Sequence, residues 1–291
     1  MVSAAGVASD LAGAWYCTGG AVTGIARMDD NLKQHCAELD CCNQRGGRML
    51  SVFDLLDAGT LDLDLAACLM ARISRGASFM VGALPGGAGK TTVMAALLNL
   101  APADRPLAAA TAEAVHSARQ VRSTPRCYIC HEISPAHYFC YLWGEALREY
   151  CRMGRCGHML ATNQHADDLV EARDQVCGEN AVPIEDFGRF DLLVFLRVDG
   201  GLRPRRRIER VYCGDGGNGH RLIFDAAAGL VPDLDSPECV GDSAYARRCR
   251  EFLERTWAAG TRTIEQTRQA VLEFFSASSP AAVSPAGREC A

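Results

Sequence analysis

The chain has 291 residues, of which 48% are hydrophobic, and a formal net charge of −5. This composition predicts a globular protein with a full-sized core, and the negative charge gives no overall field that would attract nucleic acid, so no nucleic-acid partner is expected. No stretch approaches the roughly 18 uninterrupted apolar residues of a membrane span, and the N-terminus lacks a signal-peptide pattern, so we expect a cytoplasmic protein.

The N-terminal residues 1–48 are rich in small and polar residues and predict a poorly defined segment with one helix at most. From Met49 the pattern sharpens. Ser51 is expected to cap a helix, and apolar residues recur at helical spacing from Leu63 to Ile73. This helical region leads into a short apolar stretch, 77–82, that reads as a buried strand.

A glycine-rich loop follows, Leu84-Pro-Gly-Gly-Ala-Gly-Lys-Thr91, and an apolar helix continues from it. Its glycines allow backbone N–H groups to face phosphate oxygens, Lys90 can reach the β and γ phosphates, and Thr91 offers a hydroxyl to Mg²⁺. Leu84 stands where the usual pattern has glycine. The loop predicts a nucleotide site formed by Gly86, Gly87, Ala88, Gly89, Lys90, Thr91 and Thr92; the alternative is a glycine-rich turn that merely precedes a helix.

Strands and helices then alternate. We expect strands at 106–110, 127–132, 158–162 and 191–198, and helices at 136–152 and 166–177. This alternation predicts an α/β fold with a mainly parallel sheet and the nucleotide at the carboxyl ends of its strands. A hairpin of 205–213 with 220–224 predicts an antiparallel edge.

A linker at 232–237 and helices at 243–258 and 263–275 complete the predicted elements, with Thr263 capping the last helix and Glu265 close behind it. We therefore divide the chain into an N-terminal segment (1–48), a nucleotide-binding core (49–231), a C-terminal helical region (238–276) and a disordered tail (277–291).

Phosphoryl transfer needs carboxylates near the metal ion and the attacking water. Glu132 ends an apolar strand on the next crossover and is expected beside Thr91, as catalytic residue and metal ligand. Glu113 is the second candidate catalytic acid. Each has a structural alternative: a surface residue at a strand end for Glu132, and a first-turn helix carboxylate for Glu113.

Two further patterns have both a functional and a structural interpretation. Cys127, Cys130, His131, His137 and Cys140 could hold zinc, but the strand that contains the first three favours buried, reduced cysteines. The arginines of 203–207 could contact a polyanion locally; we prefer solvated side chains flanking the hairpin.

Several of these residues together resemble the ATPases of type II and type IV secretion and of type IV pilus assembly. Gly157–Asp168, with two histidines seven residues apart, resembles their histidine box. Cys130–Ile133 resembles their Walker B segment, and Asp199–Val211 resembles their Asp-Gly-x-Arg hairpin. The similarity covers residues 50–275 and is most specific at the glycine-rich loop and the histidine box.

The resemblance implies a RecA-like P-loop core that uses ATP and Mg²⁺, and a homo-oligomer in the form of a hexameric ring. It also implies a peripheral place at the inner membrane, against a secretion or pilus platform protein. His165 would then lie near the γ-phosphate or link it to the neighbouring subunit; its alternative is a helix-capping or core histidine.

Departures from the family pattern point to weak hydrolysis. Where the family has an acidic box, residues 107–113 keep only Glu113, and Arg126 stands where an aspartate normally opens the Walker B strand. Three functions therefore remain open. The first is an ATP-hydrolysing motor subunit, the second a nucleotide-binding sensor or assembly protein with little hydrolysis, and the third, ranked lowest, a small-molecule kinase.

Overall fold

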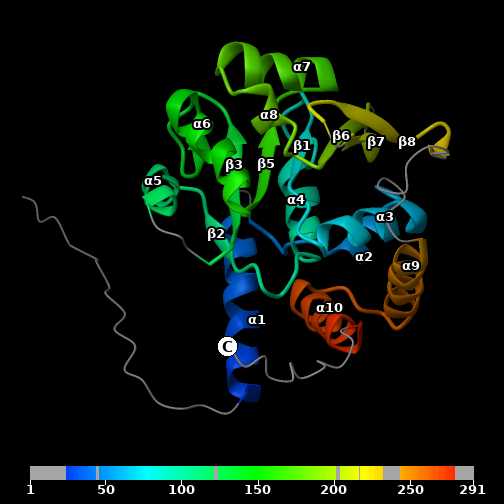
Figure 1. Ribbon diagram of the computed structural model, residues 1–291. Helices are drawn as coiled ribbons and strands as arrows, with labels where there is room; N and C mark the ends of the chain where they lie inside the picture. Colours follow the sequence, from blue (N-terminus) through cyan, green and yellow to red (C-terminus); the bar gives the residue numbers. More distant parts are fainter. Residues whose placement is uncertain are drawn as a thin grey trace, which may run out of the picture.

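The computed structural model describes residues 24–43, 46–120, 124–200, 204–215, 217–231 and 243–278. Within these ranges the chain forms a mixed α/β fold around one sheet of nine strands (Figure 1). The strands are β1 (Phe79–Gly82), β2 (Leu107–Ala109), β3 (Cys127–Ile133), β4 (Tyr141–Leu142), β5 (Met159–Gln164), β6 (Leu192–Asp199), β7 (Arg205–Gly214), β8 (His220–Asp225) and β9 (Gly229–Leu230).

The sheet runs in the order β2-β3-β5-β1-β6-β7-β8-β9, with β4 beside β3. The first five of these strands are parallel, as is the short β4, and β7, β8 and β9 extend the sheet in antiparallel pairs. The predicted, mainly parallel sheet with an antiparallel hairpin edge is confirmed.

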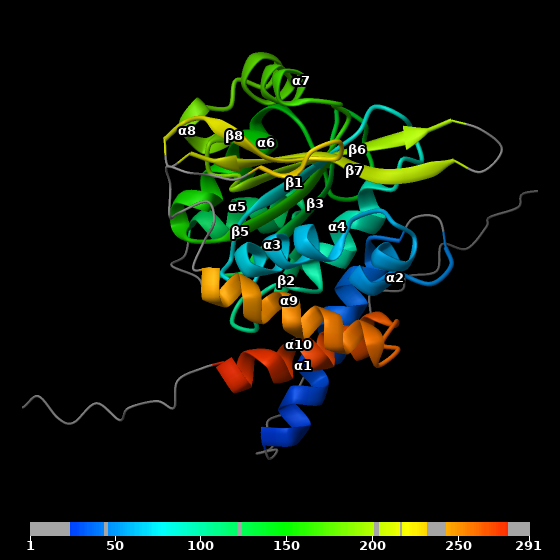
Figure 2. The same cartoon turned by 90° about the vertical axis from the view of Figure 1, so that its right-hand side faces the viewer.

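Helices cover both faces of the sheet. They are α1 (Gly24–Cys41), α2 (Val52–Asp57), α3 (Leu63–Ile73), α4 (Lys90–Leu98), α5 (Ala112–Gln120), α6 (Gly144–Arg152), α7 (Leu169–Arg173), α8 (Ile184–Phe187), α9 (Ser243–Ala258) and α10 (Ile264–Ser278). Figure 2 shows α1, α2, α3, α4, α9 and α10 on one side of the sheet, and α6, α7 and α8 on the other.

The two layers have separate hydrophobic cores. Within β3, the side chains of Cys127 and Ile129 belong to the core under α4, whereas Tyr128 and Cys130 belong to the core under α6. This alternation follows from the two-residue period of a strand. A strand of seven buried residues is what a central position in a parallel sheet requires.

The same alternation bears on the zinc alternative. Because Cys127 and Cys130 face opposite sides of β3, they cannot share one ligand sphere. No group of three metal-binding side chains occurs in the described part of the chain. Burial raises the pKa of the Cys130 thiol to about 12, and the twelve cysteines described are free. Cys127 and Cys130 are small apolar side chains of the core.

The region after Met49 forms two capped helices instead of one continuous helical stretch. The Ser51 hydroxyl accepts the N–H groups of Phe53 and Asp54, and the Asp54 carboxylate accepts the Ser51 N–H (2.7 Å), which completes a capping box for α2. Asp62 caps α3 through the Leu65 N–H (2.7 Å). A second capping residue ahead of Leu63 is why the chain starts a new helix there.

Two predicted helices were placed too early. The first begins at Gly144, not at 136, because positive φ angles at Cys140 (56°) and Gly144 (59°) interrupt the chain around β4. The second begins at Leu169, not at 166, because Asp168 caps it, and it continues as a π-helical turn from Asp174 to Glu179. In both cases local turn chemistry overrides helical periodicity.

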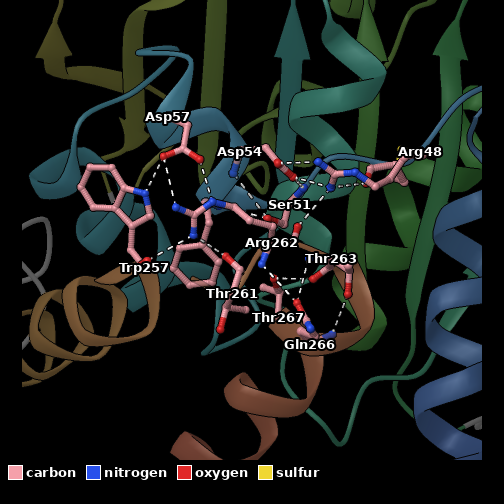
Figure 3. Close-up of polar contacts among 12 residues, drawn as sticks. Arg48, Ser51, Asp54, Asp57, Trp257, Thr261, Arg262, Thr263, Gln266 and Thr267 are labelled. Atoms are coloured by element: carbon pink, nitrogen blue, oxygen red, sulfur yellow. Dashed lines mark hydrogen bonds and ion pairs between the residues drawn. The ribbon is translucent and has the colours of Figure 1, made fainter. Parts of the chain in front are cut away.

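The predicted C-terminal helices are confirmed, and their connection is fixed to α2 (Figure 3). Arg262 Nε donates to Asp57 (2.6 Å), and the Trp257 indole donates to the same carboxylate (2.8 Å). Thr263 caps α10 as expected, but its reciprocal partner is Gln266 and not Glu265. The C-terminal helices thus pack into the same hydrophobic core as α2, α3 and α4, and their connection is hydrogen-bonded to α2.

The buried guanidinium of Arg268 holds α10 against the end of α4. Arg268 is 4% exposed and donates to the carbonyl oxygens of Asn99 (3.2 Å) and Ala101 (2.5 Å). In turn, the Asn99 amide donates to the Ile264 carbonyl (2.9 Å). A cation at this position satisfies the last carbonyls of α4 and complements its dipole.

Two predicted segments, the linker at 232–237 and most of the tail at 277–291, lie outside the described residues. Within the described residues, none of the helices combines the length and the apolar character that crossing a membrane requires.

Candidate nucleotide site

The register of the parallel strands brings the predicted site residues to one edge of the sheet. Gly82 at the end of β1 lies beside Gln164 at the end of β5, and Ile133 at the end of β3 pairs with the same Gln164. The residues at these three strand ends therefore meet. They are the loop 83–89, which we call the glycine loop, together with Glu132 and His165.

The glycine loop uses glycine where the backbone requires it. Gly87 (φ 85°) and Gly89 (φ 97°) are in the left-handed region, and Gly89 is the residue that precedes α4. Gly82, just before the loop, has a different need: a Cβ there would lie 2.7 Å from the Ala166 carbonyl oxygen and from the Phe195 ring. Glycine at position 82 thus allows the loop to approach the 165–168 segment.

The ammonium of Lys90 lies under the loop and is 7% exposed. Its Nζ donates to the Ala83 carbonyl oxygen (3.1 Å) and lies 3.5 Å from Glu132 Oε1. The predicted convergence of Lys90 and Glu132 is therefore present in the structure. Burial raises the pKa of Glu132, and the charges of Lys90 and His165 oppose that rise.

His165 joins this pair from the end of β5. Its Nδ1 lies 3.1 Å from Lys90 Nζ, and its Nε2 lies 3.6 Å from Glu132 Oε1. Its Nδ1 also lies 3.2 Å from the Leu84 carbonyl oxygen, so one side of the ring faces the ammonium and that carbonyl while Nε2 faces the carboxylate. The imidazole is 45% exposed, so it borders the site instead of filling the core. His158, the other histidine of the pair, lies at the opposite end of β5.

Asn163 is a site residue that sequence reasoning did not single out. Its Nδ2 donates to the His131 carbonyl oxygen (2.9 Å) and lies 3.4 Å from Thr91 Oγ1. Its Oδ1, like Glu132 Oε1, is buried without a hydrogen-bond partner among the described residues. An amide within the histidine-box segment, on a strand next to β1, is the signal that could have identified it.

Arg206 and Asp167 hold the glycine loop from either side. Arg206, on β7, donates its Nε hydrogen to the Gly87 carbonyl oxygen (3.1 Å). Asp167 Oδ1 accepts the Leu84 N–H (2.6 Å). Arg205 and Arg206 are exposed, in agreement with the expected solvated side chains, although Arg206 also contacts the loop; Arg207 is partly buried and pairs with Asp199 and Glu209. Arg203 lies outside the described residues.

Glu113 is not part of this group. It lies exposed in the first turn of α5, after β2, and β2 is separated from β1 by β3 and β5. No hydrogen bond or ion pair joins it to Lys90, Glu132 or His165 within the described ranges. Its position corresponds to the alternative of a first-turn helix carboxylate.

The residues at this edge fit a magnesium nucleotide. A buried ammonium beside a loop with left-handed glycines, at the start of a nine-residue helix, is a setting for phosphate oxygens. Asn163 Oδ1, near the Thr91 hydroxyl, has no hydrogen-bond partner among the described residues, and Glu132 Oε1 makes only the two long ion-pair contacts there, so both are acceptors that water on Mg²⁺ would satisfy. Thr91, Glu132 and Asn163 are therefore the residues that could hold the hydrated ion.

Comparison with solved structures finds the VirB11 ATPase from the Brucella suis type IV secretion system, crystallised in complex with sulphate. The two chains are 16% identical, with a TM-score of 0.41, over 66% of this chain and 59% of that one. This chain therefore spans less than two thirds of that protein. The likeness is a distant structural relationship. Comparisons with protein-family models and with curated proteins give no match.

Proposed function

We propose that this protein binds ATP with Mg²⁺ at the glycine loop and hydrolyses it slowly, as the subunit of a homo-oligomeric motor. One observation carries the proposal: Lys90 Nζ and Glu132 Oε1 lie 3.5 Å apart at the carboxyl edge of a parallel sheet. A buried ammonium for phosphate and a carboxylate for water then occupy the same site.

The residues divide the chemistry between them. The N–H groups of residues 86–92 and the Lys90 ammonium bind phosphate oxygens. The Thr91 hydroxyl is the group that would bind Mg²⁺. Mg²⁺, when bound, neutralises charge on the phosphate oxygens. Glu132 orients a water molecule and accepts its proton, for which a raised pKa is suited. His165, whose Nε2 lies 3.6 Å from Glu132 Oε1, positions the same carboxylate.

Lys90 and Glu132 form an ion pair in which each charge compensates the other. Phosphate would draw the ammonium away from the carboxylate, and this exchange would release Glu132 for its role as base. The ion pair thereby couples nucleotide binding to activation of the carboxylate. We propose on this basis that Glu132, and not Glu113, is the principal acid.

A second candidate function is a nucleotide-binding protein with little turnover. The position of Glu113 favours it, because that carboxylate lies in the first turn of α5, apart from the pair of Lys90 and Glu132. Loss of a water-orienting acid can reduce turnover by about 10²–10⁴-fold while nucleotide binding persists. The ring, the inner-membrane platform partner and the secretion or pilus role follow from the family resemblance and belong to the proposal.

Nucleotide binding and phosphate release, measured on the same variants, test the proposal. Glu132→Gln should still bind ATP but release phosphate at least about 10²-fold more slowly than the wild type. Thr91→Ala should weaken ATP binding in the presence of Mg²⁺. Glu113→Gln is the matched carboxylate control and should retain most of the activity. Tight binding without any turnover in the wild type would favour the second candidate, and no ATP binding would refute both.

Oligomeric state is tested separately by sedimentation with a non-hydrolysable ATP analogue. A strictly monomeric chain would refute the ring while leaving the nucleotide site intact.

A further inference from the structure

A second, cationic cavity lies at the opposite edge of the sheet. Its lining includes Ser78, His158 and Asp191, which immediately precede β1, β5 and β6, so it opens at the amino ends of the strands. Glu132 and the glycine loop are at the carboxyl ends of the same sheet. The cavity has a volume of about 1290 Å³, and we call it the edge groove.

The edge groove concentrates positive charge in a protein that is negative overall. Its walls carry six arginines from α3, α9 and three loops, which are Arg72, Arg75, Arg105, Arg189, Arg247 and Arg250. Three carboxylates face them, and two of these are engaged. Arg250 pairs with Asp64 (2.7 Å), and Asp191 accepts the Ser78 N–H (2.8 Å). The third carboxylate belongs to Glu185.

Three of these arginines make no ion pair with the described residues. Arg105 donates to the Gly157 carbonyl oxygen, and its guanidinium lies over Gly76, where an added Cβ would be 3.1 Å from Arg105 Nε. The Arg189 side chain packs over Gly154 in the same way. Arg247 is exposed on α9. The two glycines leave room for the Arg105 and Arg189 side chains along the wall of the groove.

Guanidinium groups from several directions are a setting for phosphate, which accepts paired, charge-assisted hydrogen bonds. The volume exceeds the roughly 300–1,000 Å³ of ordinary small-ligand pockets, so a ligand with more than one phosphate can enter. A long polyanion is disfavoured, because the whole chain carries a net charge of −5 in spite of the groove arginines, and the negative surface outside the groove would repel it.

We propose that the edge groove binds a small molecule carrying two or more phosphate groups, at a site independent of the glycine loop. Arg105, Arg189 and Arg247 bind the phosphate oxygens. The ligand is defined by this chemistry, and a nucleotide with several phosphates or an inorganic polyphosphate would both satisfy it.

Titration calorimetry with inorganic tripolyphosphate tests the proposal on the full chain. Lys90→Ala removes the ammonium of the glycine loop and should leave binding in the edge groove. In that background, Arg189→Ala with Arg247→Ala should weaken tripolyphosphate binding about tenfold or more, as expected for lost charged hydrogen bonds. Arg197→Ala with Arg255→Ala removes the same charge from exposed arginines outside the groove and should change little.

A second measurement covers the case in which Lys90→Ala fails to fold. The wild-type chain should bind tripolyphosphate at two sites, the glycine loop and the edge groove. The Arg189 and Arg247 substitutions in the otherwise wild-type chain should abolish binding in the edge groove and spare the glycine loop. Equal tripolyphosphate affinity in the groove double variant (Arg189 and Arg247) and the control double variant (Arg197 and Arg255) would overturn the proposal. So would binding of a single-stranded oligonucleotide in the groove without binding of tripolyphosphate.

Discussion

Arg206 on β7 donates its Nε hydrogen to the carbonyl oxygen of Gly87, 3.1 Å away, and so links the antiparallel edge of the sheet to the glycine loop. The Arg206 side chain also covers Gly89, where an added Cβ would lie 3.4 Å from Arg206 Cδ. The guanidinium thereby sets the position of two loop glycines that lie in the left-handed region.

Arg206→Ala should weaken ATP binding about tenfold, because the loop loses a charged hydrogen bond, worth about 1.5 kcal/mol, that orders it before phosphate binds. Equilibrium binding of a fluorescent ATP analogue measures the effect. Arg205→Ala is the matched control, since neighbouring side chains of a strand face opposite sides and Arg205 is exposed. Equal losses in the two variants would show that general charge, and not this contact, matters.

Removing Lys90 should expose the cost of burying Glu132. Lys90→Ala leaves a carboxylate with 10% exposure and no ammonium beside it, so we expect a loss of about 3 kcal/mol in the free energy of unfolding at pH 7.5. Lys90→Ala with Glu132→Gln should recover part of that loss, because the uncompensated charge is gone. Urea unfolding measures both; a double variant no more stable than the single one would contradict the explanation.

His35 should make the protein less stable in mild acid. Burial lowers its pKa well below the usual value, and the charge of Arg268 adds to this effect. Below about pH 6.5 the unfolded chain therefore takes up a proton at His35 that the folded chain does not. The free energy of unfolding then decreases as the pH is lowered.

His35→Gln removes that proton uptake. Relative to wild type, the variant should gain about 1.4 kcal/mol on moving from pH 7.5 to pH 5.5, one pH unit below the unfolded pKa. Urea unfolding at both pH values gives the difference. A constant offset between the two proteins would mean that His35 protonates equally in the folded and unfolded states.

Gly82→Ala should destabilise the protein by about 1–3 kcal/mol, because its methyl group overlaps the Ala166 carbonyl oxygen and the Phe195 ring. Gly86→Ala is the matched control within the same segment. Its added Cβ would meet nothing within 4 Å, so thermal unfolding should shift little. A similar shift in both variants would refute the close approach at Gly82.

Much of the glycine loop and its surroundings follows from the sequence. The apolar stretch before it, the apolar run of β3 and the alternation of elements predict that Lys90 and Glu132 meet at one sheet edge, because parallel strands end together. His165 was identified in a different way, through the resemblance to a family motif, and it follows the last residue of β5 directly.

The contributions of Arg206, Asn163 and Asp167 could not be read from local patterns. The contact of Arg206 depends on the hairpin folding back toward a loop 119 residues earlier, and a run of arginines gives no indication of which one makes that contact. Likewise, Glu113 is next to a strand in sequence, but the strand order puts two strands between β2 and β1. Such relationships are set by topology, which single-sequence periodicity does not encode.

The helix α4 has the glycine loop at its first residue and the Arg268 guanidinium at its last carbonyls. Nine residues of α-helix span about 14 Å, and a buried helix of this length moves as a rod. Under the proposed function, a displacement of the loop on phosphate binding would be transmitted along α4 to its contact with α10.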